Sequence, residues 1–404
     1  MNTTKLRNSQ REQVLLVLAT ATFLIFFQAF MIAPLIPEFA ETFGVSVEYV
    51  GLVVPAYLIP YGFATLVYGP LSDNVGRRPL ILGSMVAFIL LTGVTAAVDT
   101  VLSLIAIRLL TGIGASAVVP IAITLIGDLY EYGTRGRALG WIFGGMQAGI
   151  AFGSTSGAVL EPFIGWRGLF LGVSVLGVGI MGALLFYRSA LGGHAGDGPS
   201  MTATDALRGF VGLLRSKRGF SVYLYVFLNA LFHSGVYTWL GYYFTQQYGL
   251  GEIGIGIAIV GYGVPGIVLG PKIGELADRY GRRWIIPLGL VIGGISVVGL
   301  VLDVPLLVAA GLVTTLSIGY DMTQPLFAGI VTDLTDKTGL AMGLNVFALF
   351  VGFGLGSLVF SGALQFGLNT ALVLFGVAAV IAALVAVPLF RGETLAATEP
   401  STSG

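Results

Sequence analysis

The sequence predicts an all-α membrane protein in which twelve transmembrane helices form two pseudo-symmetric six-helix bundles. Three observations lead to this fold class. The chain has 404 residues, of which 56% are apolar and only 10% are charged, whereas about 25% of a soluble domain is charged. Its apolar residues gather in segments long enough to cross a bilayer. Finally, a charged ten-residue block occurs twice, at residues 69–78 and 274–283.

The apolar segments follow one another along the chain and are interrupted by few charges. A spanning helix needs about 20 predominantly apolar residues. The apolar run after the polar N-terminus is too long for a signal-peptide core and has no small-residue cleavage site, so we interpret it as the first span. The expected spans are 13–37, 47–70, 78–98, 101–127, 137–160, 166–187, 220–245, 253–273, 284–302, 305–332, 340–364 and 368–390.

A polar stretch after the sixth span divides the chain into two halves. We expect an N-terminal six-helix bundle at 1–187, a cytoplasmic linker at 188–219 and a C-terminal six-helix bundle with a short cytoplasmic tail at 220–404. The linker begins with Gly and Ser, which are typical of flexible segments. It continues with DALRGFVGLLRSKRG, which we expect to form a basic amphipathic helix on the membrane surface.

The basic residues predict how the chain lies in the membrane. Cytoplasmic loops carry an excess of Lys and Arg. Of the 20 Lys and Arg residues, all but Arg108 and Arg167 fall on one face of the twelve-span arrangement. Arg167 falls on the opposite face and Arg108 lies inside a span. We therefore expect a multi-pass protein of the plasma membrane, the cytoplasmic membrane of a prokaryote, with both termini cytoplasmic.

The repeated block sets the register between the two halves. GPLSDNVGRR and GELADRYGRR share six identical positions. Parallel six-helix repeats about an axis along the membrane normal form a transporter architecture. The same 205-residue offset pairs Gln28 with His233, Tyr57 with Tyr262, Gly114 with Gly319, Pro120 with Pro325 and Asp128 with Asp333, and an offset of 203 then pairs Gly149 with Gly352 and Gly153 with Gly356.

The block also resembles the signature loop of the major facilitator superfamily, Gly-x-Leu-x-Asp-(Arg/Lys)-x-Gly-Arg-(Arg/Lys). The first copy departs from it at Asn74, and the second copy, with Arg279, matches fully. The resemblance covers essentially the whole chain. It implies the major facilitator fold and secondary transport by alternating access, and we expect the protein to be a monomer.

The two signature loops are expected to form a gating latch on the cytoplasmic side. We expect Asp73 to accept hydrogen bonds from the N-terminus of the eleventh span, and Arg77 to pair with Asp128. In the family, such contacts hold the halves together when the cavity faces outward. The alternative is that the basic residues only enforce topology. The latch residues are Gly69, Asp73, Gly76, Arg77, Arg78, Asp128, Asp278, Arg282 and Asp333.

Two charged residues inside spans are candidates for proton coupling or substrate contact. A charge within a span is costly and is a functional hypothesis by default. Arg108 begins a stretch with Gly112 and Gly114 that resembles the family's Arg-x-x-x-Gly-x-Gly motif, which is linked to proton coupling. Asp321, in the tenth span, can alternate between its protonated and charged forms. The alternatives are an Arg bonded to first-span carbonyls and a neutral acid bonded within the bundle.

Uncharged polar residues and glycines complete the candidate site. We expect His233 and Gln28 to face the cavity, although a helical His is often only a packing residue. Tyr57 and Tyr262 each precede a Pro by three residues, and we expect them to line or gate the cavity. The aromatic residues Phe26, Phe27, Phe30, Phe232, Tyr237 and Trp239 suggest a lipophilic cavity wall.

Gly149, Gly153 and Gly157, each four residues apart, predict a flat helix face for close packing. The run resembles the fifth-helix motif of the drug:proton antiporter families, Gly-Pro-x-x-Gly-Gly, but lacks its Pro and last Gly. Generic packing is the alternative.

Several kinds of chemistry are excluded by what the sequence lacks. The chain has no Cys and only two His, which excludes a His/Cys-rich metal site. It has no phosphate-binding Gly-Lys-Ser/Thr loop, and its zero net charge gives no sign of nucleic-acid binding. We expect no cofactor and no enzymatic activity, so the energy for transport comes from an ion or substrate gradient.

The leading hypothesis is therefore a secondary transporter that exports a lipophilic drug or metabolite by proton antiport, with substrate, protons and the bilayer as its partners. The first span holds no carboxylate, which favours neutral, zwitterionic or anionic substrates over strictly cationic ones. The alternatives are proton-coupled uptake of a sugar or organic acid and flipping of an amphiphilic lipid. An intramembrane enzyme or a channel is a hypothesis of a different class.

Overall fold

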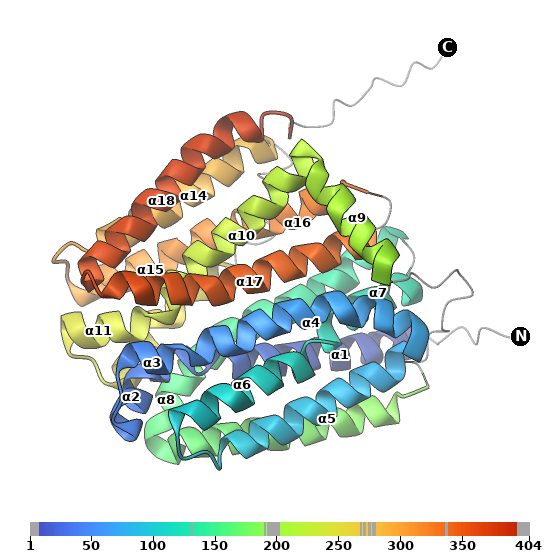
Figure 1. The fold of residues 1–404 in the computed structure, drawn as a ribbon, viewed down its shortest axis with the longest axis horizontal. Helices are drawn as coiled ribbons and strands as arrows, with labels where there is room; N and C mark the ends of the chain where they lie inside the picture. The colour runs from blue at the N-terminus through green and yellow to red at the C-terminus, as the bar shows by residue number, and fades with distance from the viewer. Residues whose placement is uncertain are drawn as a thin grey trace, which may run out of the picture.

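The structure is a computed structural model that describes residues 8–130, 132–189, 191, 203–266, 269, 272, 273, 276, 280–335 and 338–393. In these residues the chain is helical and has no strand. The long helices run side by side along one common direction (Figure 1). This arrangement satisfies each backbone polar group within its own helix, which hydrocarbon requires of a spanning segment.

The first half of the chain forms helices up to residue 186. Its elements are α1 (Asn8–Phe30), η1 (Ala33–Leu35), α2 (Ile36–Phe43), α3 (Val47–Gly51), α4 (Val53–Val75), α5 (Arg77–Thr95), α6 (Val101–Ala115), α7 (Val118–Leu129) and α8 (Tyr132–Phe186).

The second half begins with a short helix at the predicted linker. Its elements are α9 (Ala203–Arg215), α10 (Lys217–Thr238), α11 (Leu240–Tyr248), α12 (Glu252–Ile259), η2 (Val260–Tyr262), α14 (Arg282–Gly299), α15 (Leu306–Asp321), α16 (Gln324–Thr332), α17 (Thr338–Leu364) and α18 (Leu368–Leu389).

The described helices confirm the predicted membrane fold. Ten helical segments are long and apolar enough to cross a membrane, and Glu252–Gly266 is a shorter apolar helix. The longest segment, Gly140–Phe186, is broken at Gly165, whose φ of 67° and ψ of 160° lie outside the helical region. This break divides the segment into the fifth and sixth predicted spans, so the described segments account for all twelve.

The ends of the helices define two faces of the molecule. The basic face carries the start of α1, the start of α14 and the Gly76 turn with Arg77 and Arg78. The acidic face, at the opposite end, carries Glu41 of α2 and Glu252 at the start of α12. The basic face is the one that the sequence predicts to be cytoplasmic.

Both signature loops turn at a glycine in the left-handed half of conformational space. Gly76 separates α4 from α5 with a φ of 92°, and Gly281 precedes α14 with a φ of 82°. Residues with a Cβ rarely adopt such positive φ values. The repeated Gly in the sequence motif therefore corresponds to a repeated backbone turn.

A row of glycines brings α8 against the backbone of α1, and we call this contact the glycine seam. A Cβ at Gly145 would lie 2.6 Å from the carbonyl oxygen of Ala19, and one at Gly149 would lie 2.5 Å from that of Phe23. Cβ atoms at Gly153 and Gly157 would meet the backbone of Phe27 and Met31. The close approach that the sequence predicts for this face is thus made with α1.

The second half repeats the seam between α17 and α10. A Cβ at Gly352 would lie 2.5 Å from the carbonyl oxygen of Phe227, and one at Gly356 would meet the carbonyl of Leu231. These are the glycines that the 203-residue offset pairs with Gly149 and Gly153. The internal repeat is therefore visible in helix contacts as well as in sequence.

The helix predicted within the linker is present as α9. Gly209 packs beside Leu340 of α17. Leu207, Val211 and Leu214 lie on one exposed apolar side of the helix. Their spacing fits the amphipathic helix that the sequence predicts, and its position on the membrane surface stays a prediction.

Substitution at the seam tests the close packing. We expect Gly153→Leu to lower the free energy of unfolding by about 1–3 kcal/mol, because the new side chain would overlap the α1 backbone. Gly179→Leu is the matched control, since a Cβ at Gly179 meets no atom within 4 Å. Thermal unfolding of the detergent-solubilised variants measures both effects. Equal transition temperatures for the two variants would contradict the seam.

Candidate substrate and proton site

A cavity of about 900 Å³ lies between the two halves of the chain. The N-terminal half contributes α1, α7 and α8 to its wall, and the C-terminal half contributes α15, α16, α17 and Gly266. In α8, α15 and α17 the lining residues belong to the part of the helix nearer the basic face. Two of the lining residues, Leu16 and Trp141, are 47% and 49% exposed, so the cavity reaches the surface.

The acidic side of the same interface is closed. A Cβ at Gly51 would lie 2.8 Å from the Trp239 ring, and one at Gly241 would lie 3.0 Å from the carbonyl oxygen of Pro34. The Ser154 and Tyr237 hydroxyls form a hydrogen bond between the halves. The cavity therefore opens toward the basic face and ends below these contacts.

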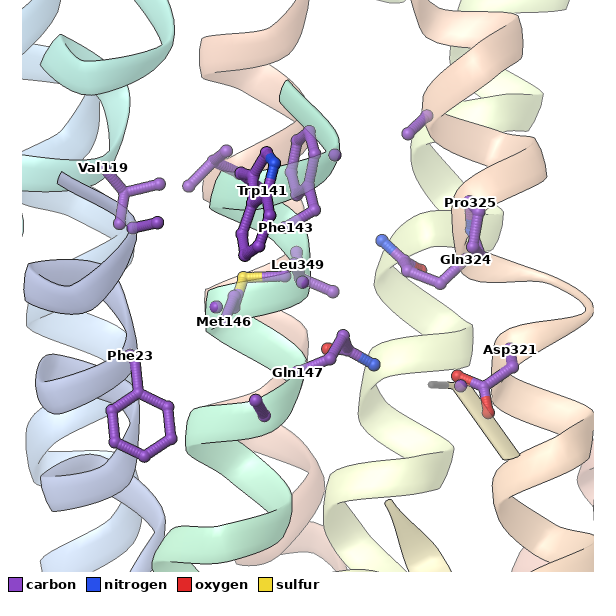
Figure 2. Close-up of a pocket in the computed structure, with 18 of the residues that line it drawn as sticks. Phe23, Val119, Trp141, Phe143, Met146, Gln147, Asp321, Gln324, Pro325 and Leu349 are labelled. Carbon is purple, nitrogen blue, oxygen red and sulfur yellow. The ribbon is translucent and has the colours of Figure 1, made fainter. Parts of the chain in front are cut away.

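The cavity wall is mostly aromatic and aliphatic. Phe23 comes from α1, Trp141, Phe143 and Met146 come from α8, and Leu349 comes from α17 (Figure 2). The wall is lipophilic, but its aromatic residues are not the ones that the sequence led us to expect. Those residues are absent from the described lining. Phe26 packs against Phe350, which does line the cavity, and Phe30 contacts Tyr237 in the closed interface.

Asp321 is the ionisable carboxyl group of the described cavity wall. It is 5% exposed and is the last residue of α15, where the tenth span breaks before α16. Ser317 Oγ donates a hydrogen bond to Asp321 Oδ2 at 3.3 Å. A Cβ at Gly266 would lie 2.8 Å from Asp321 Oδ1, so the absence of a side chain there makes room for the carboxyl. Burying a charge without a partner is costly, so a proton or a bound cation stabilises this group.

Amide side chains complete the polar lining, and the sequence did not single them out. Figure 2 shows Gln147 of α8 and Asp321 pointing into the space between the halves from opposite sides. Gln147 Oε1 and Asn345 Oδ1 have no hydrogen-bond partner within the described structure. Asn229 Nδ2 donates to Gln324 Oε1 at 3.4 Å. In the sequence, the signal that could have identified them is an amide side chain inside an otherwise apolar span. Such an amide needs a hydrogen-bond partner, which a ligand can supply.

Arg108 lies outside the described cavity wall, in a fully buried cluster with Gln28 and Tyr57. Its Nη1 donates to Gln28 Oε1 at 3.0 Å, and its Nη2 donates to the carbonyl oxygen of Ala29 at 3.0 Å. Its Nε donates to the carbonyl oxygen of Val53 at 3.3 Å. The guanidinium carbon stands 4.3 Å from the Tyr57 ring centroid, a cation–π distance. Arg108 therefore links α6 to α1 and α4, as the structural alternative proposed.

The glycines of the Arg108 motif allow this helix packing. A Cβ at Gly112 would meet the backbone carbonyl of Tyr57, and one at Gly114 would lie 2.8 Å from the Ala87 Cβ. The motif thus holds α6 against both α4 and α5. Its role in coupling stays a prediction.

His233 and Tyr262 lie together in the second half, behind the cavity wall. His233 is 1% exposed and its Nδ1 is 3.4 Å from the Tyr262 hydroxyl oxygen. Its ring stands 5.0 Å from the ring of Tyr320, which does line the cavity. The structure therefore brings His233 and Tyr262 together in the second half of the chain. Gln28 and Tyr57 join Arg108 in the first half.

The predicted latch is described only in part. Arg282 Nη1 and Asp333 Oδ2 form an ion pair at 3.2 Å, with 31% and 54% of the two side chains exposed. The pair joins α14 to the end of α16 and lies within the second half. Gly76, Arg77 and Arg78 form the equivalent turn of the first half. Asp278 and the side-chain positions of Gly69, Asp73 and Asp128 lie outside the described residues.

A twelve-span helical fold with a cavity between two repeated halves is the architecture of a membrane transporter. The chain belongs to the Major Facilitator Superfamily, whose family model matches residues 18–257 and 222–403. The family agrees with the signature loops, and relatives named as a chloramphenicol resistance protein and multidrug resistance protein D show that the chain resembles the drug efflux families.

The relatives carry different names. The chain is 26% identical to the uncharacterized MFS-type transporter YwfA of Bacillus subtilis, over 65% of this chain and 63% of the relative. It is 35% identical to multidrug resistance protein D of Escherichia coli, over 36% of this chain and 37% of the relative. It is 25% identical to citrate exporter 1 of Aspergillus niger, over 62% and 53%. The matches thus span less than two thirds of these relatives' lengths.

The fold is also that of a solved transporter. The crystal structure of a bacterial homolog of the human lysosomal transporter Spinster, in an inward-facing and unoccupied conformation, aligns with a TM-score of 0.74. The alignment covers 97% of this chain and 100% of the other at 17% identity.

Removal of the Arg108 charge tests the buried cluster. We expect Arg108→Met to destabilise the protein by about 1–3 kcal/mol for each buried acceptor left without a donor. Arg167→Met is the control, because Arg167 forms a surface ion pair with Asp99 that is worth about 0–1 kcal/mol. Thermal unfolding compares the two variants, and an unchanged transition temperature in Arg108→Met would contradict the structural role.

Proposed function

We propose that this protein exports a lipophilic small molecule by proton antiport through alternating access. The proposal places it in the cytoplasmic membrane of a prokaryote, with both termini and the basic face in the cytoplasm. The observation that carries it is the position of Asp321, the one carboxyl or basic group among the described residues lining an aromatic cavity.

In this proposal, the described state is open to the cytoplasm and accepts substrate from that side. Closure on the acidic side by the Gly51–Trp239 and Gly241–Pro34 contacts supports this interpretation. The likeness to an inward-facing Spinster homolog is consistent with it. A transporter of this kind exchanges this state for one open to the outside.

Asp321 carries the proton in the exchange. The substrate enters from the cytoplasm, the Asp321 carboxyl releases its proton to that side, and the carboxylate contacts the substrate. After reorientation, a proton from outside neutralises the carboxylate and the substrate leaves. One proton moves inward for each substrate that moves outward, because the same oxygen atoms hold one or the other.

The lining chemistry favours neutral or cationic substrates. No Lys, Arg or His occurs among the described residues of the wall, and Arg108 is enclosed by its own partners. An anion would face Asp321 without a counter-charge. The unpartnered acceptors of Gln147 and Asn345 suit donors on the substrate. This differs from the sequence-based expectation, which favoured neutral, zwitterionic or anionic substrates over strictly cationic ones.

A transport assay tests the function. Inverted membrane vesicles with an acidic interior receive chloramphenicol, tetraphenylphosphonium or citrate as probes. We expect the neutral or the cationic probe to make the vesicle interior more alkaline and citrate to leave it unchanged. We expect Asp321→Asn to abolish this proton efflux. Asp303→Asn, the same change at an exposed position, should behave like the wild type.

Two results would contradict the proposal. Proton and probe entering right-side-out vesicles together would indicate uptake by symport, the alternative for a sugar or organic acid. Full proton efflux in Asp321→Asn would remove Asp321 from the coupling. A fluorescent phospholipid that changes leaflet in the same vesicles would instead support a lipid flippase.

A further inference from the structure

The internal repeat places a titratable residue beside the position at which the first half holds a permanent charge. In the first half, Arg108 lies between Gln28 and the Tyr57 ring. The corresponding positions of the second half are Val313, His233 and Tyr262. Val313 brings no charge and little volume, and His233 contacts Tyr262 directly at 3.4 Å.

Two buried polar atoms at His233 and its neighbour Tyr320 lack hydrogen-bond partners in the described structure. His233 Nε2 has no hydrogen-bond partner in the described structure, and neither does the Tyr320 hydroxyl. Both residues are at least nine-tenths buried. Unpartnered buried polar atoms are rare in native proteins and call for an explanation such as proton exchange.

Few titratable groups face His233 from the helices around it. Helices α17 and α18 have none, α14 has only Arg282 and Arg283 at its start, and η2 contributes Tyr262. Helix α15 contributes Tyr320, whose ring contacts His233, and then Asp321. Asp321 is thus the acid nearest to His233 along the described helices that pack around it.

His233 also lies deeper in the molecule than Asp321. It is 16 residues beyond the start of α10 at Lys217, and Asp321 is 11 residues before the end of α16 at Thr332. With a rise of about 1.5 Å per residue, the two lie about 24 Å and about 17 Å from the basic ends of their helices. His233 is therefore nearer the acidic face, while Asp321 lies in the cavity.

Tyr262 contacts His233, and the segment that carries Tyr262 also packs against Asp321. The Tyr262 hydroxyl meets His233 Nδ1, and Gly266, four residues further along the same segment, lies against the Asp321 carboxyl. The segment is irregular here, because a 3₁₀ turn at Val260–Tyr262 interrupts the helix. Such turns within helices often mark functional sites.

We propose that His233 is a second proton-binding residue and that it passes its proton to Asp321 through Tyr262. This inference rests on the proposed proton coupling. The proton on Nδ1 of the imidazolium moves to the Tyr262 oxygen. Asp321 bonds to Ser317 in the described state, so the Tyr262 hydroxyl proton moves to the Asp321 carboxylate once reorientation brings the two groups together. Neutral His233, neutral Tyr262 and protonated Asp321 result. When the acidic side opens, His233 receives a proton from that side, and Asp321 later releases it into the cavity.

The imidazole can be observed directly, because the chain contains only His194 and His233. We use ¹⁵N-histidine-labelled His194→Gln protein in lipid nanodiscs and record the ring nitrogen signals from about pH 5 to about pH 9. We expect the signals of His233 to change between their neutral and protonated positions. We expect Asp321→Asn to alter this titration and Tyr262→Phe to alter the Nδ1 signal. Signals that do not respond to pH, or that ignore Asp321→Asn, would overturn the proposal.

Transport of tetraphenylphosphonium or chloramphenicol, whichever the wild type exchanges for protons, separates this proposal from the proposed function. We expect His233→Gln to keep exchange of that probe without a gradient and to lose about tenfold or more of its proton-driven transport. His194→Gln is the matched control and should behave like the wild type. If the wild type moves no protons with any probe, the proposed function fails. If it does and His233→Gln is equally well coupled, only the role of His233 fails.

Discussion

The structure depends on close backbone contact between helices that are all surrounded by the hydrocarbon of the bilayer. In hydrocarbon, two helices gain little from burying apolar side chains against each other, so association depends on packing and on hydrogen bonds. The glycine seam meets this requirement by removing side chains from α8 where it crosses α1. The second half solves the problem in the same way between α17 and α10, with Gly352 and Gly356 in the corresponding places. Each half thereby becomes a unit that can move as a body.

The contacts between the halves are of a different kind. On the acidic side they include side chains, such as Trp239 against Gly51 and the hydrogen bond between the Ser154 and Tyr237 hydroxyls. Side-chain contacts can be exchanged more readily than a backbone seam, because rotamers change without breaking a helix. The Arg108 cluster reinforces the first half and does not cross to the second. Rigid halves joined by replaceable contacts are what alternating access requires.

Much of the fold could be predicted from the sequence, because span length and charge placement follow from the bilayer itself. The break at Gly165 and the turns at Gly76 and Gly281 occur where the spans were expected to end. The cavity wall could not be predicted in the same way, since Gln147 and Asn345 look like isolated amides until the helices are packed. Phe26 and Phe30 were expected in the wall, but Phe26 packs against the wall residue Phe350 and Phe30 packs against Tyr237 on the acidic side. Whether a span residue faces the cavity depends on the rotation of its helix and on which side is open.

The two charged span residues that are not repeated in the other half, Arg108 and Asp321, also show how far the sequence alone can predict the site. Arg108 and Asp321 both stand out as charges in apolar spans, and the sequence alone treats them alike. Packing separates them: Arg108 finds an amide and two carbonyls within its own half, whereas Asp321 finds one hydroxyl and the cavity. That difference supports a structural role for Arg108 and the proposed exchange with a ligand for Asp321. The repeat adds that His233 corresponds to Gln28, beside the place that Arg108 fills.

The most direct test of the account is whether the two halves open and close at opposite faces. The chain has no Cys, so spin labels can be attached to introduced pairs alone. Glu41→Cys with Gln247→Cys reports the acidic face, and Val75→Cys with Thr332→Cys reports the basic face, all at exposed positions. Pulsed electron–electron distance measurements in nanodiscs would follow both pairs as pH is changed. The account predicts that one distance lengthens as the other shortens. Distances that stay fixed, or that change in the same direction, would contradict it.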